Sequence, residues 1–370
     1  MDPKVFRSSP ICAILLLVAA GLLSSAAVRA RTPNETLLTP DNAYNPIPSP
    51  DGEYVAYVRT GWGEGIWIGL GRASLVSDVK LINTEGAPNP KVLAKNFFLS
   101  GWTPDGTRVV CYRDWNYALV STEGEQQLKG RIPNDPNHIE NVADWVAYSP
   151  SSGTVLWSRV INESQRVIET PDHVVAHQPA FWHGLWKERV VPSPDGRYLA
   201  VFQEASETHL RIYDLQHRSW TDLGPLTIHP DKDWSYIQPN WNPWFADGSR
   251  LVFVQKSAVL IATPDGTTLS EIRVAGAAGL PVPSPDGTII AFVTFEPRPK
   301  KVRPDLQFWG STTIWVVPAS GATEPRAVTA KNQDEVLDLK WLNDGAIVFD
   351  RVADDPLYAH ARIWKATVPR

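Results

Sequence analysis

Five of the eight histidines fall in polar stretches that separate apolar segments of the sequence. His173, His177 and His183 lie in one stretch, and His229 and His360 lie in two others. Neutral imidazoles are frequent ligands of divalent metals and act as general acids or bases near neutral pH. The first two are four residues apart but have no helical pattern around them, so a structural role is the alternative for that pair.

Aromatic and basic residues accompany these histidines. Aromatic rings supply stacking area for a ligand, although covering the edge of a sheet is the commoner role of an isolated Trp. A basic run that includes Lys300, Lys301 and Arg303 precedes Trp309, and such runs are more often solvated loops than anion sites. The candidate ligand-binding residues are His177, Trp182, His183, Trp186, His229, Trp234, Arg303, Trp309 and His360.

Several kinds of chemistry find no support in the sequence. It contains no Gly-x-Ser-x-Gly nucleophile motif, no glycine-rich phosphate loop, no cysteine pair for zinc and no His-Glu-x-x-His motif. The formal net charge is −5 and no long Lys/Arg run occurs, which disfavours nucleic acid as a partner. We expect no cofactor, with a divalent metal only if the histidines converge.

A sevenfold repeat must position the candidate residues. Each copy has a Pro or an aromatic residue, a short turn that ends in glycine, and an apolar run, as in Pro283-Ser284-Pro285-Asp286-Gly287. Proline presets φ, aspartate bonds the local backbone, and glycine takes the positive φ that closes the turn. The turn glycines are Gly52, Gly106, Gly153, Gly196, Gly248, Gly287 and Gly345.

Each repeat has room for four short strands. The second strand follows the turn, and third strands are expected at 66–68, 117–120, 210–213, 259–261, 314–317 and 363–365. Fourth strands are expected at 91–93, 126–128, 165–168, 220–223, 269–272 and 326–328. Units of about 40–50 residues with four strands are typical of β-propeller blades, which bury both faces only by stacking in a closed ring.

Closure of the ring is expected to use the first strand of the domain. The last repeat has three strands, and Glu35-Thr36-Leu37-Leu38 precedes the first turn. If this segment completes the last blade, no open edge remains there. The sequence thus predicts an all-β, seven-bladed propeller over 31–370, with six or eight blades as alternatives because the third copy is weak. We assign packing roles to Trp102, Trp244, Trp315, Trp341 and Trp364, which lie at repeat positions.

The turn and the Leu-Ala-Phe-like strand after it resemble the WD-like propeller repeat of the TolB family. A similar repeat occurs in the propellers of prolyl oligopeptidases and in oligogalacturonate lyase. The resemblance covers nearly the whole of 31–370 and implies the fold more strongly than the function. TolB has six such blades and an extra N-terminal domain, for which this sequence has no room.

Residues 1–30 predict export. Lys4 and Arg7 precede an apolar stretch from Ile11 to Leu23, and Val28-Arg29-Ala30 fits a cleavage site. We expect a signal peptide at 1–30 and a periplasmic or secreted product with no membrane span; an uncleaved anchor is the alternative. Cleavage would leave Cys111 as the one cysteine, which we expect to be a buried apolar side chain.

Two classes of function follow. The first is a non-catalytic propeller that binds a protein or glycan through the loops opposite the Pro-Asp-Gly turns. The second is a carbohydrate-active enzyme similar to oligogalacturonate lyase, in which histidines hold a divalent metal and Arg or Lys neutralises a uronate. Measuring bound metal and turnover of acidic polysaccharides would separate the two classes.

Overall fold

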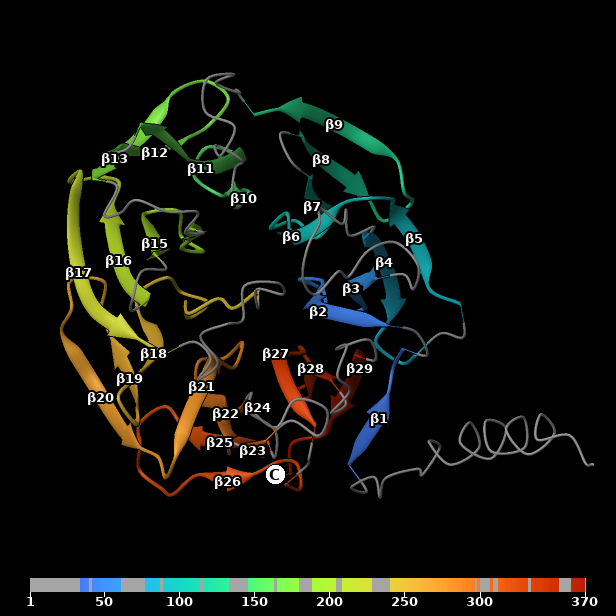
Figure 1. The fold of residues 1–370 in the computed structure, drawn as a ribbon, viewed down its shortest axis with the longest axis vertical. Coiled ribbons are helices and arrows are strands. Elements are labelled where there is room, and N and C mark those ends of the chain that lie inside the picture. The colour runs from blue at the N-terminus through green and yellow to red at the C-terminus, as the bar shows by residue number, and fades with distance from the viewer. Residues whose placement is uncertain are drawn as a thin grey trace, which may run out of the picture. The chain divides into compact units, whose positions relative to one another are not determined.

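Seven small antiparallel sheets stand around a ring in the computed structural model (Figure 1). The structure describes residues 34–39, 42–60, 77–86, 89–113, 116–132, 146–162, 165–179, 188–203, 208–227, 240–296, 298–299, 307–308, 312–331, 334–352 and 361–369. These residues contain no helix, and hence no helix able to cross a membrane. The prediction of an all-β, seven-bladed propeller is confirmed.

Blades 1 to 4 have four strands each, which follow chain order across the sheet. Blade 1 is β2 (Ala43–Pro48), β3 (Tyr54–Thr60), β4 (Ser77–Asn83) and β5 (Lys91–Ala94). Blade 2 is β6 (Phe98–Trp102), β7 (Arg108–Arg113), β8 (Asn116–Ser121) and β9 (Gln126–Arg131). Blade 3 is β10 (Val146–Ser149), β11 (Thr154–Asn162), β12 (Gln165–Glu169) and β13 (Val174–Pro179). Blade 4 is β14 (Glu188–Pro192), β15 (Tyr198–Gln203), β16 (Thr208–Asp214) and β17 (Ser219–Leu226).

Blades 5 to 7 depart from that regular pattern. Blade 5 has the three strands β18 (Leu251–Gln255), β19 (Ala258–Ala262) and β20 (Thr268–Arg273). Blade 6 is β21 (Ala277–Pro283), β22 (Ile289–Phe295), β25 (Thr313–Pro318) and β26 (Arg326–Ala327), with the pair β23 (Arg298–Pro299) and β24 (Gln307–Phe308) between β22 and β25. Blade 7 is β27 (Glu335–Trp341), β28 (Ile347–Val352), β29 (Ala361–Ala366) and β1 (Glu35–Leu37).

The strand β1 occupies the outer position of blade 7. It pairs with β29 in antiparallel register, with Glu35 opposite Ala366. The carboxylate of Glu35 also accepts hydrogen bonds from Arg351 of β28, and both side chains are buried. One blade therefore combines strands from the two ends of the described chain.

The repeated turn is held by its own side chains. In blade 6 the Ser284 hydroxyl donates to Asp286 Oδ1 at 2.6 Å, and the Thr288 N–H donates to the same oxygen at 3.0 Å. These two bonds hold the pKa of Asp286 below its usual value. Gly287 has φ +69°, and the turn glycines of the other six blades also have positive φ. The turn conformation expected from Pro-Asp-Gly is confirmed.

Three tryptophans at repeat positions join adjacent blades. Each indole N–H donates to a backbone carbonyl on the first strand of the preceding blade. The pairs are Trp102 to Ile47 at 3.0 Å, Trp244 to Val191 at 3.0 Å, and Trp341 to Val282 at 3.1 Å. The packing role predicted for these side chains is confirmed, since buried indole groups need such a partner.

Three strands differ from the prediction. The third strand of blade 1 is β4 at Ser77–Asn83, not 66–68, which lies outside the described residues. The segment 165–168 is the third strand of blade 3, because a tight turn at Thr170–His173 adds β13 as the fourth. In blade 5 the expected first strand is reduced to a single bridge between Trp244 and Leu251.

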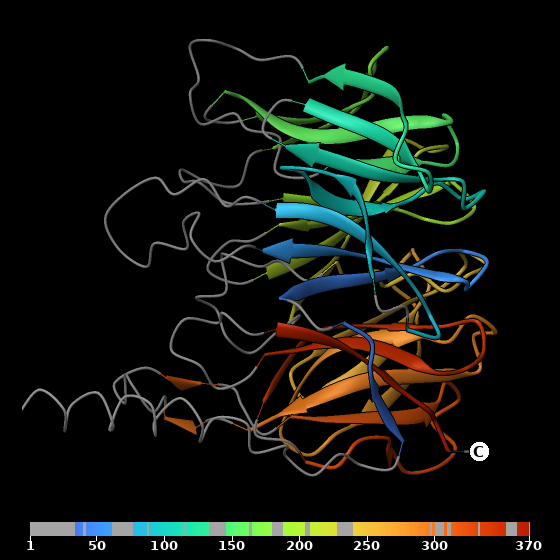
Figure 2. The same ribbon diagram turned by 90° about the vertical axis from the view of Figure 1, so that its right-hand side faces the viewer.

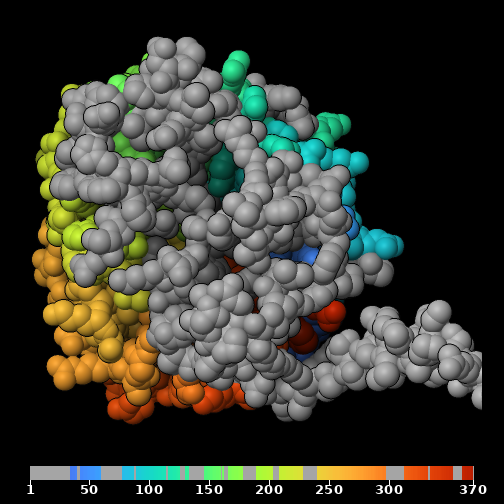
Figure 3. Space-filling model, in the orientation of Figure 1, coloured from blue at the N-terminus to red at the C-terminus, as the bar shows by residue number. Residues whose placement is uncertain are grey.

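The hydrophobic core lies between neighbouring sheets. The largest cluster of buried side chains runs through blades 4 to 7 and includes Phe202, Trp241, Phe253 and Phe349. The thiol of Cys111 is fully buried in the cluster between blades 1 and 2, as predicted. In the space-filling view the blades follow one another around the circumference in chain order (Figure 3).

The two ends of the ring differ in their connections. The repeated turns, between first and second strands, lie at one end together with those between third and fourth strands (Figure 2). We call this the turn end. At the opposite end, which we call the loop end, second strands pass to third strands and each blade passes to the next.

Candidate functional site

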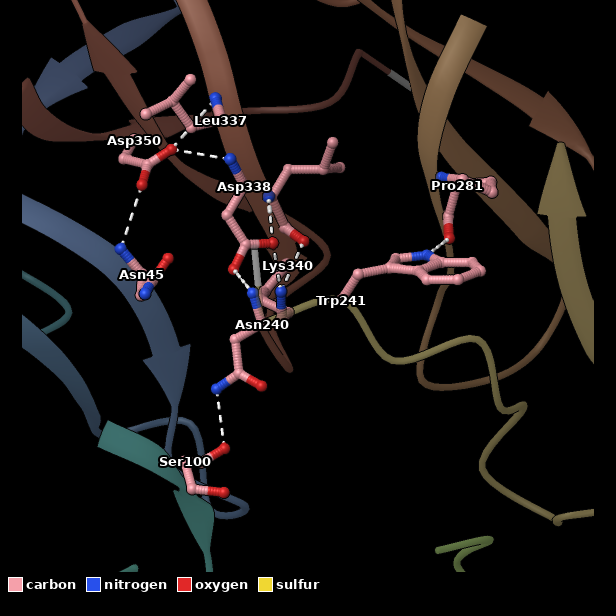
Figure 4. Close-up of polar contacts among 10 residues, drawn as sticks. Asn45, Ser100, Asn240, Trp241, Pro281, Leu337, Asp338, Lys340 and Asp350 are labelled. Atoms are coloured by element: carbon pink, nitrogen blue, oxygen red, sulfur yellow. Dashed lines mark hydrogen bonds and ion pairs between the residues drawn. The ribbon is translucent and has the colours of Figure 1, made fainter. Parts of the chain in front are cut away.

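Polar side chains from several blades meet near the axis of the ring (Figure 4). The chain before β18 supplies part of this group: residues 240–243 form no strand, and this segment extends toward the centre of the ring (Figure 1). We call the group the axial cluster and define it as Asn45, Ser100, Asn240, Asp338, Lys340 and Asp350.

Asn240, from the chain before β18, is bonded to both blade 7 and blade 2. Its backbone N–H donates to Asp338 Oδ2 of blade 7 at 2.9 Å. Its side-chain amide donates to the carbonyl oxygen of Ser100 in blade 2 at 2.7 Å. The Ser100 hydroxyl in turn donates to the carbonyl oxygen of Val146 in blade 3. These bonds connect the first strands of blades 7, 2 and 3 through the segment that contains Asn240.

Asp350 holds backbone groups of two blades. Its Oδ1 accepts the N–H groups of Leu337 at 3.1 Å and Asp338 at 2.7 Å, both in blade 7. Its Oδ2 accepts the N–H of Asn45 in blade 1 at 3.0 Å. One buried carboxylate thus accepts three N–H groups, two of which belong to the bulge residues Asn45 and Leu337.

Irregularities of the first strands create these free N–H groups. Asn45 has φ +52° and lies in a bulge of β2 between Tyr44 and Ile47. Leu337 is the extra residue of a bulge in β27, which shifts the register between Val336 and Asp338. Bulges leave a residue unpaired and redirect the neighbouring side chain, which explains why polar groups point inward here.

The charges of the cluster are strongly coupled. Asp338 and Asp350 are fully buried, and the side chain of Lys340 is 13% exposed. Burial, and then the nearby charge of Asp338, raise the pKa of Asp350 to about 7. Burial also lowers the pKa of Lys340, although the Asp338 carboxylate, which accepts a bond from Lys340 Nζ, opposes that shift.

This arrangement can store or release a proton near neutral pH and can hold blades together. A pair of nearby carboxyl groups whose environments differ is also the arrangement used in general acid and base chemistry. Within the described part of the chain, no group of three His, Cys, Asp or Glu side chains is placed to hold a metal ion.

Two of the predicted histidine positions are corrected by the structure. His173 lies in the turn between β12 and β13, at the turn end, where its ring faces the Thr170 hydroxyl at 3.2 Å. His177 is exposed in β13, the outer strand of blade 3, opposite Val167. Neither lies in the connection from blade 3 to blade 4, because β13, a strand not expected from the sequence, follows His173 and contains His177.

The remaining candidates cannot be placed in the site. They lie outside the described residues: Trp182, His183, Trp186, His229, Trp234, Arg303, Trp309 and His360. Trp241, also from the connection into blade 5, is fully buried, and its indole N–H donates to the Pro281 carbonyl at 2.5 Å. It therefore packs between blades and is not free for a ligand.

The sequence reasoning missed the axial cluster. A signal for it exists, because Asp338 and Asp350 each interrupt an apolar strand, in Val336-Leu337-Asp338-Leu339 and in Val348-Phe349-Asp350. A charged residue inside an apolar run is seldom buried without a partner. The sequence offers no sign that Asn240 and Ser100 meet them.

Comparisons with known proteins support the fold alone. No protein-family model matches the chain, and no curated protein matches it in sequence. The β-propeller domain of Cps50 (Swd1) from Myceliophteria thermophila is similar in structure, with a TM-score of 0.55 and 12% identity over 90% of this chain and all of that one. An oligogalacturonate lyase solved in complex with manganese has a TM-score of 0.55 and 14% identity over 92% of this chain and 95% of its own. The chain is thus similar in architecture both to a propeller domain and to an enzyme.

Proposed function

We propose that this chain is an exported, non-catalytic β-propeller that binds a protein or glycan partner at the loop end of the ring. The observation that carries the proposal is the difference between the two ends. At the turn end, hydroxyl and carboxylate groups are used to hold the turns, as in Ser49 and Asp51 at 2.5 Å. These hydroxyl and carboxylate groups are therefore already bonded within the turns.

The loop end has the long connections. Described strands end and begin at this end around the segments 61–76, 133–145, 180–187, 228–239, 300–306 and 353–360. Long loops on a rigid scaffold are where binding residues concentrate. The hydrogen bonds of Asn240 to blades 7 and 2 fix the chain that follows one of these segments.

The composition of these connections fits a binding surface. Eight of the sixteen Trp residues fall in the parts of these connections that lie outside the described residues: Trp62, Trp67, Trp115, Trp145, Trp182, Trp186, Trp234 and Trp309. Trp is enriched among residues that dominate binding energy, and it stacks on sugar rings. The basic run with Arg303 adds a preference for acidic groups on the partner.

A direct test uses the intrinsic Trp fluorescence of the purified protein. We expect quenching or a blue shift on titration with one or more of a panel of neutral and uronic-acid oligosaccharides. Trp182→Ala and Trp234→Ala should weaken binding at least tenfold while leaving the melting temperature nearly unchanged. Trp220→Ala is the matched control, because that side chain packs on Tyr213 in blade 4 at a centroid distance of 4.8 Å.

The same panel of oligosaccharides also tests the second candidate function, that of an enzyme. Turnover of an oligogalacturonide that depends on added Mn²⁺ would contradict the non-catalytic proposal and favour an enzyme similar to oligogalacturonate lyase. The similar fold of that lyase motivates this arm of the test. His183, His229 and His360 are then the metal ligands to replace, since His173 lies at the turn end and His177 is exposed in β13.

We also propose that the protein is exported and that its repeat is of the TolB type. The signal peptide is proposed for 1–30, which lies outside the described residues. N-terminal sequencing of the protein from its native compartment should begin at Arg31. A chain that begins at the initiator Met and sediments with membranes would instead support the uncleaved anchor.

A further inference from the structure

The seam between blades 7 and 1 joins the two ends of the repeat array. At the turn end it is bridged by the Asn343 amide, which donates to the Pro50 carbonyl at 2.7 Å. Nearer the axis it is bridged by Asp350, which accepts the Asn45 N–H at 3.0 Å. The first bridge is uncharged, whereas the second depends on a titratable group.

We propose that this seam is a pH-sensitive latch, in which the protonation state of Asp350 decides how tightly β2 of blade 1 is held against blade 7. The geometry points to this role because the carboxyl group of Asp350 is completely buried and contacts both sides of the seam. It is also linked, through Asp338 and Asn240, to Ser100 of blade 2.

The groups around Asp350 determine the sign of the effect. From β27 it faces the carboxylate of Asp338 and the ammonium group of Lys340, and Arg189 of β14 adds positive charge beside Lys340. The first strand of blade 1 contributes the buried Tyr44 and the uncharged Asn45. On β29 the residue paired with Asp350 is Ile363.

Two further charged groups on blade 7 complete the surroundings. Arg351, the next residue of β28, is bonded to Glu35, so its charge is compensated within blade 7. Glu335 is buried at the start of β27. Among all these groups, burial and the charge of Asp338 dominate at Asp350 and favour its neutral form.

Linkage then gives the direction. The pKa of Asp350 is raised from 3.8 to about 7 in the closed seam, so the closed state binds a proton that the open state releases to solvent. The latch is therefore tightest in acid and loosens as pH rises. The equilibrium constant for opening of this seam should rise about fiftyfold from pH 5 to pH 7. From pH 7 to pH 8 it should rise less than about twofold.

Hydrogen exchange of the folded wild-type chain measures this directly. The reporter amides are those of Asn45 and Leu337, which both donate to Asp350. After correction for the intrinsic rate, their protection should fall about fiftyfold between pH 5 and pH 7. The same fall in protection should be seen in low concentrations of urea. The exchange rates of these amides should depend only weakly on urea, because opening of the seam exposes little surface.

Variants identify the responsible group. Asp350→Asn should remove most of the pH dependence at Leu337. Asp338→Asn should make the fall in protection between pH 5 and pH 7 smaller, because losing the repelling charge lowers the pKa of Asp350 in the closed seam toward its usual value. Asp344→Asn, a carboxylate of the same blade at the turn end, should leave the pH dependence as in the wild type. Should Asp350→Asn fail to fold, the wild-type titration still decides the question.

Three outcomes would overturn the latch. One is protection at Asn45 and Leu337 that does not change between pH 5 and pH 7. Another is an unchanged pH dependence in Asp350→Asn. The third is exchange with the full urea dependence of global unfolding, which would mean that Asp350 affects the stability of the whole ring and not the seam.

Discussion

The buried ion pair between Glu35 and Arg351 allows the docking of β1 to be measured as a free energy. Arg351 Nη1 donates to Glu35 Oε2 at 2.8 Å and Nη2 donates to Oε1 at 3.4 Å, with both side chains 4% exposed. The guanidinium lies 4.9 Å from the Phe349 ring centroid and 5.5 Å from that of Trp364. These rings exclude water, so nothing replaces the carboxylate if it is removed.

Glu35→Gln keeps the size of the side chain and removes its charge. Leaving one buried partner uncompensated costs about 3–5 kcal/mol. With an unfolding entropy of about 2.1 cal/mol/K per residue, the unit from Glu35 to Arg370 should lose roughly 4–7 °C in melting temperature. The loss should be largest at low salt and persist at high salt, because a buried pair is screened weakly.

Urea unfolding followed by far-ultraviolet circular dichroism measures the change. The double variant Glu35→Leu/Arg351→Met should regain most of the lost stability, since replacing both charges by apolar groups is often neutral. Glu296→Gln, which breaks the exposed pair with Lys331, is the control and should change little. A Glu35→Gln chain as stable as the wild type would refute the argument that this pair holds β1 in blade 7.

Further predictions concern turns, blade contacts and the thiol. Gly287→Ala should cost about 1–3 kcal/mol, because φ is +69° and a Cβ would meet neighbouring atoms at 3.2 Å; Gly345→Ala, where φ is +81° but space is open, should cost less in the same denaturation assay. Trp341→Phe should lower the free energy of unfolding by about 1–2 kcal/mol, because it removes the hydrogen bond to Val282. An unchanged midpoint of urea unfolding would show that this bond does not contribute to stability. Burial raises the pKa of the Cys111 thiol, so it should react with an alkylating reagent only after unfolding, as mass spectrometry can show.

Some strands could not be placed from the sequence. A strand is recognised by its own residues only where apolar alternation is clear, as at 314–317 and 210–213, which the structure confirms. The strand β4 has the pattern Ser77-Asp78-Val79-Lys80-Leu81, whereas 66–68 has more apolar residues. Local strand propensity therefore predicts a strand at 66–68. The third strand of blade 1 is β4 because that segment pairs with β3 in the folded sheet.

The repeat, and with it the architecture, follows from local sequence patterns. Proline, aspartate and glycine act on the backbone within a few residues, so the turn at Gly287 can be read without knowing what surrounds it. Seven such turns require stacked sheets, since one sheet cannot bury both faces. The packing roles of Trp102, Trp244 and Trp341 follow from the same repeat.

The places where polar side chains meet depend on how the blades are assembled. Asn240 and Ser100 are 140 positions apart, and Asn45 and Asp350 are 305 apart, yet each pair is hydrogen-bonded. These contacts depend on the closure of the ring and on bulges that turn side chains toward the axis, which no local pattern encodes. The raised pKa of Asp350 is for the same reason a property of the assembled blades and not of the strand that carries it.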